Sequence, residues 1–128
     1  PHKFFGYRRE SIDDLPVLIA DEAKAIVDSL DQLRYAGGIT EVAKALRTAS
    51  DMIDLPTLIS YANRMEDKSL GSRLGYLLEL LGQPAEGIQC SESPVRLDPT
   101  RPPQGSARNR WRIIPNVPET ELFPTGVA

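Results

Sequence analysis

Leucines recur at helical spacing between residues 67 and 82, at Leu70, Leu74, Leu77, Leu78 and Leu81. Residues three and four apart share one face of a helix, so the pattern predicts an amphipathic helix over residues 67–82 with its apolar stripe against a core. Asp67 is placed to cap the first turn, and Gly82 followed by Pro84 is typical of a helix end. Burying each leucine gains about 1.5–3 kcal/mol, so this helix is expected to be the largest contributor to the core.

Two glycines, Gly71 and Gly75, lie inside this predicted helix, four residues apart. Glycine inside a helix costs about 1 kcal/mol relative to alanine, so both positions are expected to require a small residue. We interpret the pair as a place of close packing against a neighbouring helix rather than as a ligand site.

Three further segments also carry apolar residues at helical spacing, and they predict helices over residues 21–33, 39–51 and 54–64. Asp21 and Asp54 stand where N-cap residues are preferred. The connections between the predicted helices are short, which is typical of a compact bundle.

Residues 3–19 have the composition of strands, with aromatic residues before Asp13-Asp14 and the apolar run Val17-Leu-Ile19 after it. This pattern predicts a β-hairpin with its turn at the two aspartates. Pro16 is tolerated at the first position of the returning strand.

Near the other end of the chain, residues 108–114 alternate between arginines and the residues Asn109, Trp111 and Ile113. Alternation of this kind predicts a strand, with Trp111 covering the helical core and the strand joining the hairpin. Of the 11 prolines, 8 lie in residues 83–128, so the rest of this region is expected to be extended and irregular. Residues 117–128 are expected to be a tail that is disordered or docked on a partner.

The predicted fold is therefore α+β: a compact four-helix core, with an N-terminal β-hairpin and a C-terminal strand forming one small antiparallel sheet. Residues 1–116 are predicted to form a single domain, because 128 residues suffice for one core and not for two.

The composition is that of a soluble globular protein, 41% hydrophobic and 26% charged, with a net charge of −3. The sequence contains no run apolar enough to cross a membrane and no signal peptide, and a single cysteine, Cys90, fits a reducing compartment. We therefore expect a cytoplasmic protein without membrane contact. The chain begins with Pro1 rather than methionine, so we expect a longer protein that lacks its N-terminal part here.

Residue types that carry catalysis are sparse. His2, at the terminus, is the one histidine, so no serine has a base to activate it. Cys90 has no base beside it in the sequence, and Gly37-Gly38 lacks the lysine and hydroxyl residue of a phosphate-binding loop. The sequence thus predicts a protein that is not an enzyme, with no catalytic residues, no cofactor and no metal.

Basic residues form two groups that are candidates for a partner or nucleic-acid surface: Arg64, Lys68 and Arg73 in the first, and Arg108, Arg110 and Arg112 in the second. Such groups bind phosphates or an acidic protein surface, or they are simply solvated faces of a helix and an edge strand. The sequence leaves both interpretations open, and the solvated face is the commoner of the two.

Six stretches carry a resemblance through their order and spacing, namely residues 3–7, 17–31, 35–46, 58–62, 68–79 and 110–112, the last followed by Asn116. The most distinctive parts are Ala-Gly-Gly at 36–38 and Arg-Leu-Gly-Tyr-Leu-Leu-Glu at 73–79. Together they resemble the C-terminal domain of AbiEi-family antitoxins, the antitoxin half of type IV toxin–antitoxin systems linked to abortive infection and phage defence.

This resemblance implies an antitoxin domain that counteracts a nucleotidyltransferase-like toxin, without an obligate inhibitory complex. It also implies an N-terminal winged helix, absent here, through which the whole protein would bind operator DNA and repress its operon. The alternative is the effector or dimerisation domain of a transcriptional regulator without antitoxin activity. Self-association is compatible with either interpretation.

Overall fold

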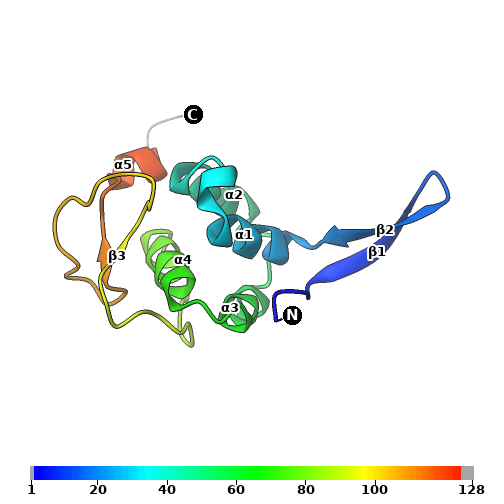
Figure 1. Ribbon diagram of the computed structural model, residues 1–128, viewed down its shortest axis with the longest axis horizontal. Coiled ribbons are helices and arrows are strands. Elements are labelled where there is room, and N and C mark those ends of the chain that lie inside the picture. Colours follow the sequence, from blue (N-terminus) through cyan, green and yellow to red (C-terminus); the bar gives the residue numbers. More distant parts are fainter. Residues whose placement is uncertain (1, 125–128) are drawn as a thin grey trace.

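The structure, a computed structural model, describes residues 2–124 and confirms the α+β class. The elements of this part of the chain are, in order, β1 (Tyr7–Ile12), β2 (Leu15–Ala20), α1 (Glu22–Asp31), a 3-10 turn (Leu33–Tyr35), α2 (Ile39–Ala49), α3 (Leu55–Arg64), α4 (Lys68–Leu80), β3 (Val95–Arg96), β4 (Ile113–Ile114) and α5 (Glu119–Leu122). Helices α1 to α4 form the body, β1 and β2 extend from one side of it, and the chain after α4 covers the opposite side (Figure 1).

The four predicted helices are confirmed, with ends that differ from the prediction by at most two residues. Asp21, Asp54 and Asp67 each cap a helix, because each carboxylate accepts hydrogen bonds from backbone N–H groups of the first turn. Sequence pattern and cap chemistry agree at these positions, which is why the boundaries were predictable.

The core lies between the four helices and is built largely from the leucine stripe of α4. Four of the five leucines in that stripe have no exposed surface, and Leu81 is partly buried. The other helices each contribute buried side chains to the same cluster, among them Val27, Ile39, Leu46 and Leu58. Burial of this kind supplies most of the stability of a domain of this size.

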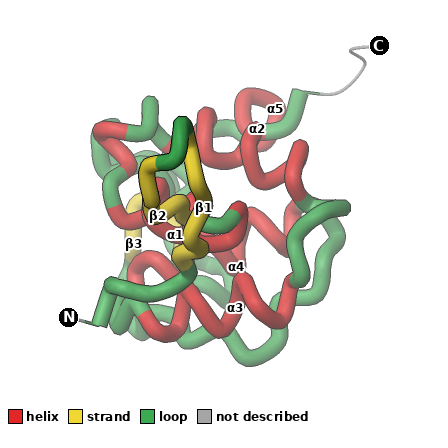
Figure 2. The backbone as a smooth tube through the Cα atoms, turned by 90° about the vertical axis from the view of Figure 1, so that its right-hand side faces the viewer, coloured by secondary structure: helices red, strands yellow, loops and turns green. Residues whose placement is uncertain are grey.

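The predicted hairpin is confirmed, and it forms an arm that projects from the body (Figure 1). β1 and β2 pair antiparallel from Tyr7 opposite Ala20 to Ile12 opposite Leu15. Asp13 and Asp14 make the turn with φ angles of 51° and 64°, left-handed values that match the twist of a two-residue hairpin. Figure 2 views the molecule from the side of the arm, with the helical body behind it.

The C-terminal strand predicted over residues 108–114 is wrong in its length and in its partner. Only Ile113–Ile114 is a strand, β4, and it pairs parallel with β3 instead of antiparallel with the hairpin. The cause is the side chain of Asn109, whose oxygen accepts hydrogen bonds from the backbone N–H groups of Trp111 and Ile113, both at 3.0 Å. These bonds fold the backbone into a turn, and Arg112 takes a φ of 60° within it.

The prediction that the tail of residues 117–128 is disordered is also wrong for residues 117–124, the part of the tail that the structure describes. Residues 119–122 form α5, which contacts α2, and Val117, Leu122 and Phe123 are buried. Arg101, in the loop after β3, makes an ion pair with Glu121 of α5. The apolar residues of this segment are too widely spaced to mark a helix, and the neighbours that bury them come from elsewhere in the chain. Residues 125–128 lie outside the described residues.

Close packing explains both glycines of α4, although the neighbour is the chain after α4 and not another helix. A β-carbon on Gly71 would lie 1.9 Å from the backbone oxygen of Gln89. A β-carbon on Gly75 would lie 2.3 Å from the ring of Trp111, which is 1% exposed and donates its indole N–H to Glu79. The expectation that Trp111 covers the core is therefore confirmed.

The start of α2 is completed by a residue from far along the chain. Gly38 is the N-cap and has no side chain to offer, and the carboxylate of Asp98 instead accepts from the N–H of Ile39 at 3.5 Å. The same carboxylate accepts from the N–H and the hydroxyl of Thr100, at 2.8 and 2.6 Å. Asn116 fixes this loop, because its side chain bonds the N–H and the carbonyl of Asp98.

We expect stability to fall in acid through Asp98. Burial raises the pKa of this carboxyl, but the hydrogen bonds from Thr100 and Ile39 outweigh it and hold the pKa below its ordinary value. A lowered folded-state pKa means that the contribution is complete above the unfolded-state pKa of about 4 and is lost as pH falls through the folded-state value. Asp98→Asn is expected to be about 1–3 kcal/mol less stable than the wild type at pH 7.

Urea denaturation of the wild type and of Asp98→Asn at pH 7 and at about pH 2.5 checks this expectation. The difference between the two proteins should shrink in acid, since the contribution of the wild-type carboxyl declines as the pH falls towards its lowered folded-state pKa. A difference that stays constant, or grows, would contradict the role given to Asp98.

Candidate functional site

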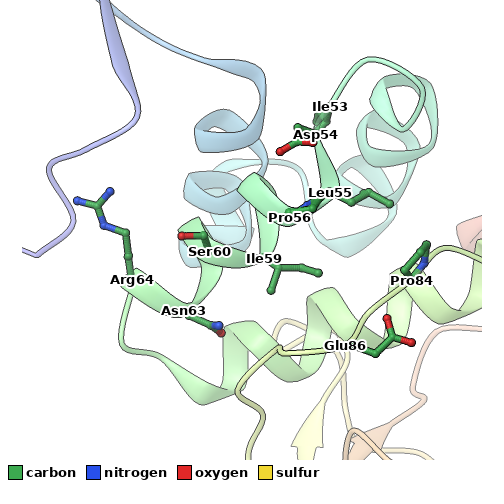
Figure 3. Close-up of a pocket in the computed structure, with 10 residues that line it drawn as sticks. All are labelled: Ile53, Asp54, Leu55, Pro56, Ile59, Ser60, Asn63, Arg64, Pro84 and Glu86. Carbon is green, nitrogen blue, oxygen red and sulfur yellow. The ribbon is translucent and has the colours of Figure 1, made fainter.

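A groove of about 850 Å³ runs along the exposed side of α3 (Figure 3). Most of its lining is apolar, and the apolar residues are Ile53, Leu55, Pro56, Ile59 and Pro84. α3 and the residues before it supply one wall, and the segment after α4 supplies the facing wall. In the view of Figure 3, Arg64 lies at the left end of the groove and Pro84 at the right, with Ile59 between them.

Asn63 holds the two walls together. Its side-chain nitrogen donates to the carbonyl of Gly87 at 2.8 Å, and its oxygen accepts from the N–H of Gln89 at 2.9 Å. These two bonds tie the segment after α4 to the last turn of α3. The groove is therefore formed by the fold itself, and an apolar ligand needs no rearrangement of the backbone to enter it.

Arg64 connects the groove to the base of the arm. Its guanidinium carbon lies 4.1 Å from the centre of the Phe5 ring, a cation–π contact worth about 0.5–1 kcal/mol at an exposed site. Phe5 also meets the ring of Tyr61 edge-on, at 5.0 Å between the ring centres. The hydroxyl of Tyr61 donates to Asp21 at 2.9 Å, and this hydrogen bond raises the pKa of the tyrosine.

Lys24 lies against the same ring and is 1% exposed. Its ammonium is 4.3 Å from the centre of Phe5 and donates to Asp28 at 2.7 Å. A charged group at this depth is satisfied by the carboxylate and the aromatic face together. Lys24 fixes the base of the arm to α1, a role that the sequence pattern did not reveal, because the prediction placed only apolar residues on the buried face of that helix.

Arg73 lies in a second hollow, of about 580 Å³, between the end of α1 and the loop after β3. Its side chain is half-buried and donates through Nε to the carbonyl of Arg96 at 3.1 Å. Burial lowers the pKa of Arg73. Arg34 and Asp31 line the same hollow, and the carboxylate of Asp31 is already paired with Lys3 at 3.0 Å.

The structure thus separates the first predicted basic group. Arg64 lines the α3 groove, Arg73 lines the second hollow, and Lys68 is exposed in the first turn of α4. The helix turns through about 100° per residue, so Lys68 and Arg73, five residues apart, lie on different sides of α4.

The second predicted group consists of exposed arginines around the Asn109 turn rather than along one strand face. Arg108, Arg110 and Arg112 are all exposed, and the guanidinium of Arg110 lies 4.4 Å from the centre of the Trp111 ring. That stacking covers the buried indole. Whether this group binds a partner stays a prediction.

Sequence reasoning missed the apolar residues of the groove and of the arm. Ile59 is one of the apolar residues of the helix predicted over residues 54–64, and it is half-buried, packed against the core and lining the groove. Leu15 and Leu18 are 66% and 55% exposed on β2. The available signal was the run Leu-Pro-Val-Leu-Ile-Ala itself, which is apolar on both faces of the strand and leaves no polar face for solvent.

Within residues 2–124, no group of three or more His, Cys, Asp or Glu side chains is arranged to hold a metal ion, and no helix has the length and apolarity to span a bilayer. Cys90, the free thiol, is half-buried. Comparison of the chain with protein-family models, with curated proteins and with solved structures finds no match.

Proposed function

We propose that this chain is the antitoxin domain of a type IV toxin–antitoxin system, as its resemblance to the AbiEi family implies. The observation that carries the proposal is the preformed α3 groove, whose exposed lining is mostly apolar and which also carries Arg64 at one end and the carboxylates of Asp54 and Glu86. Such a surface binds an apolar segment of another protein, and the arginine selects for an acidic group beside it. The domain would act by binding and not by chemistry.

The way in which the resembling stretches pack supports this class. Gly75 and Glu79, from the distinctive stretch 73–79, contact Trp111. Asn116 bonds the Asp98 loop, which completes the helix that follows Ala-Gly-Gly at 36–38. Stretches far apart in the sequence thus depend on one another physically, as expected of a family pattern that describes one fold.

The proposal names a nucleotidyltransferase-like toxin as the antagonised protein, directly or through its target. Operator DNA would be bound mainly by a winged helix N-terminal to this domain. A cytoplasmic location belongs to the same proposal, since toxin and operator are both found there.

A second candidate is the effector or dimerisation domain of a transcriptional regulator without antitoxin activity. The observation that favours it is the arm, which exposes Ile12, Leu15 and Leu18 at 53%, 66% and 55%. Exposed apolar side chains gathered on one element are typical of an interaction surface. A regulator that dimerises would bury them against another chain.

Growth rescue distinguishes the two candidates. The nucleotidyltransferase-like toxin that the proposal requires is expressed until growth stops, and residues 1–128 are then co-expressed. We expect growth to resume. If the chain is soluble and folded, as judged by circular dichroism, and growth stays arrested, the antitoxin proposal fails and the regulator becomes the better candidate.

Arg64→Glu is expected to reduce rescue about tenfold or more. The substitution removes one charge-assisted contact, and a loss of ~1.4 kcal/mol of binding free energy lowers the affinity tenfold. The domain should stay folded, since the stacking on Phe5 is worth only about 0.5–1 kcal/mol. Colony counts under toxin expression measure the effect, and thermal unfolding checks the fold.

Lys44→Glu on α2 is the matched control, since it makes the same charge change at an exposed position outside the groove. Arg110→Glu tests the second predicted group in the same assay. Full rescue by a folded Arg64→Glu chain would show that the groove is not the antitoxin surface.

A further inference from the structure

The two strands of the arm differ in charge. β1 carries Arg8, Arg9 and Glu10 in succession, whereas β2 reads Leu-Pro-Val-Leu-Ile-Ala and has no charged residue. Charged side chains on an edge strand discourage further pairing, while a continuous apolar run is typical of a strand with neighbours on both sides. β2 therefore has the composition of an inner strand and the position of an edge strand.

None of the six residues of β2 is fully buried. The two-stranded arm projects from the helical body, as Figure 1 shows, and only its base is held, by Phe5 and Lys24. A hairpin without further strands is marginal in water, and three or more strands with an apolar face are needed for stability. A strand added along β2 would meet this need.

The backbone of β2 offers a suitable edge. The N–H of Asp21 donates to the carbonyl of Gly6 at 2.8 Å, which makes residues 6 and 21 a hydrogen-bonded pair. Hydrogen-bonded and non-hydrogen-bonded pairs alternate along an antiparallel ladder, so the backbone groups of Leu18 and Ala20 face away from β1. Pro16 faces the same way and offers its carbonyl alone.

We propose that β2 pairs antiparallel with β2 of a second copy of this chain, about a two-fold axis at Leu18. The two copies then share a four-stranded sheet in which Leu18 faces the partner's Leu18. Val17 faces the partner's Ile19, and the N–H of Ala20 reaches the carbonyl of the partner's Pro16. Each of the two pairs between Pro16 and Ala20 keeps this one hydrogen bond and lacks the second, because proline has no N–H to donate to the carbonyl of Ala20.

Self-complementarity is the reason for choosing a second copy. About Leu18, every cross-strand pair joins apolar side chains, which is favourable in a sheet. The same symmetry applied to β1 would set Arg8, Arg9 or Glu10 opposite its own copy, and like charges directly opposite one another destabilise a sheet. A two-fold axis thus suits β2 and not β1.

The interface is small, because strands of six residues bury less surface than a standard protein interface. We therefore expect an equilibrium between monomer and dimer that depends on concentration. The inference rests on the arm alone, so the measurements of self-association below decide it whether the chain is an antitoxin or a dimerising regulator.

Cross-linking through an introduced cysteine tests the register. In a chain that carries Cys90→Ser, Leu18→Cys should form a disulfide-linked dimer under mild oxidation, because facing residues at the axis lie about 5.5 Å apart between α-carbons. Val17→Cys is the matched control. Val17 faces the partner's Ile19, so the two introduced cysteines are offset by two residues, and their α-carbons lie beyond the ~7 Å that a disulfide tolerates. We expect about tenfold more linked dimer from Leu18→Cys than from Val17→Cys.

Sedimentation of the unmodified chain provides a second measurement. The mass should rise with concentration from 14.1 kDa towards twice that value, and Leu18→Lys should abolish the rise without changing the circular dichroism spectrum, since Leu18 is exposed. A wild-type chain that stays at 14.1 kDa up to ~1 mM would overturn the proposal. Equal cross-linking at positions 17 and 18 would overturn the register.

Discussion

Gly71→Ala is expected to destabilise the domain by about 3 kcal/mol or more, although the same change in an open helix would stabilise it by about 1 kcal/mol. The added carbon would lie 1.9 Å from the carbonyl oxygen of Gln89. That oxygen belongs to backbone that Asn63 holds against α3, so relief of the clash breaks the bond between Asn63 and Gln89. Urea denaturation of the wild type and of the variant measures the difference in free energy of unfolding.

Ser69→Ala is the matched control, since it places alanine in the same helix at a position that is only partly buried. It should change the free energy of unfolding by less than about 0.5 kcal/mol. A Gly71→Ala chain that is more stable than the wild type would show that helix propensity outweighs the contact, and that the chain after α4 does not pack against α4 as described.

Trp111→Ala is expected to cost about 3–5 kcal/mol, the range for removal of a large buried aromatic side chain. The indole is 1% exposed, lies against Gly75 and donates to Glu79. Chemical denaturation followed by circular dichroism measures the loss, since the fluorescence of the single tryptophan disappears with the substitution.

Two further variants separate the two contributions of Trp111 to stability, its hydrogen bond to Glu79 and its packing against Gly75. Glu79→Gln keeps the volume of the side chain and weakens only the hydrogen bond, so about 1–2 kcal/mol of loss is expected. Gly75→Ala should be harmful with Trp111 present and much less so in Trp111→Ala, because the clash at 2.3 Å is then gone. If the effects of Gly75→Ala and Trp111→Ala on the free energy of unfolding simply add, the contact between Gly75 and Trp111 is contradicted.

The helical part of the fold was predictable because its signals are local. The leucine stripe of α4 and the caps Asp21, Asp54 and Asp67 each act within a few residues of the helix that they specify. Such patterns survive in any tertiary arrangement that buries one helix face. The turn of the arm was predictable for the same reason, since Asp13-Asp14 lies between an aromatic-rich segment and an apolar run.

The chain after α4 was not predictable in detail, because its structure depends on distant partners. The Asn109 turn replaces the expected strand, and Asn116 and Asp98 bond across 18 residues. The partner of Asp98 at the start of α2 is 59 residues away. No periodicity marks bonds of this range, and proline removes the alternation that would mark a strand.

The candidate site was predictable only in part. Arg64 was named from its charge, and the structure places it at the end of the α3 groove. Ile59 and the segment at Pro84 and Glu86 complete the groove, and they are brought together by tertiary contacts, among them the bonds of Asn63. A groove between two segments leaves no trace in the periodicity of either one.

The long-range cap of α2 also fixes the order in which the chain can become native. During synthesis, α1 to α4 are made before Asp98, Trp111 and Asn116. Until those residues arrive, α2 lacks the acceptor for Ile39 and the side of α4 at Gly75 stays uncovered. Contacts of such high sequence separation form late and slowly. The nascent domain is therefore open to chaperones and proteases until residues 98–116 have followed the helices, and the core closes only when that segment folds over it.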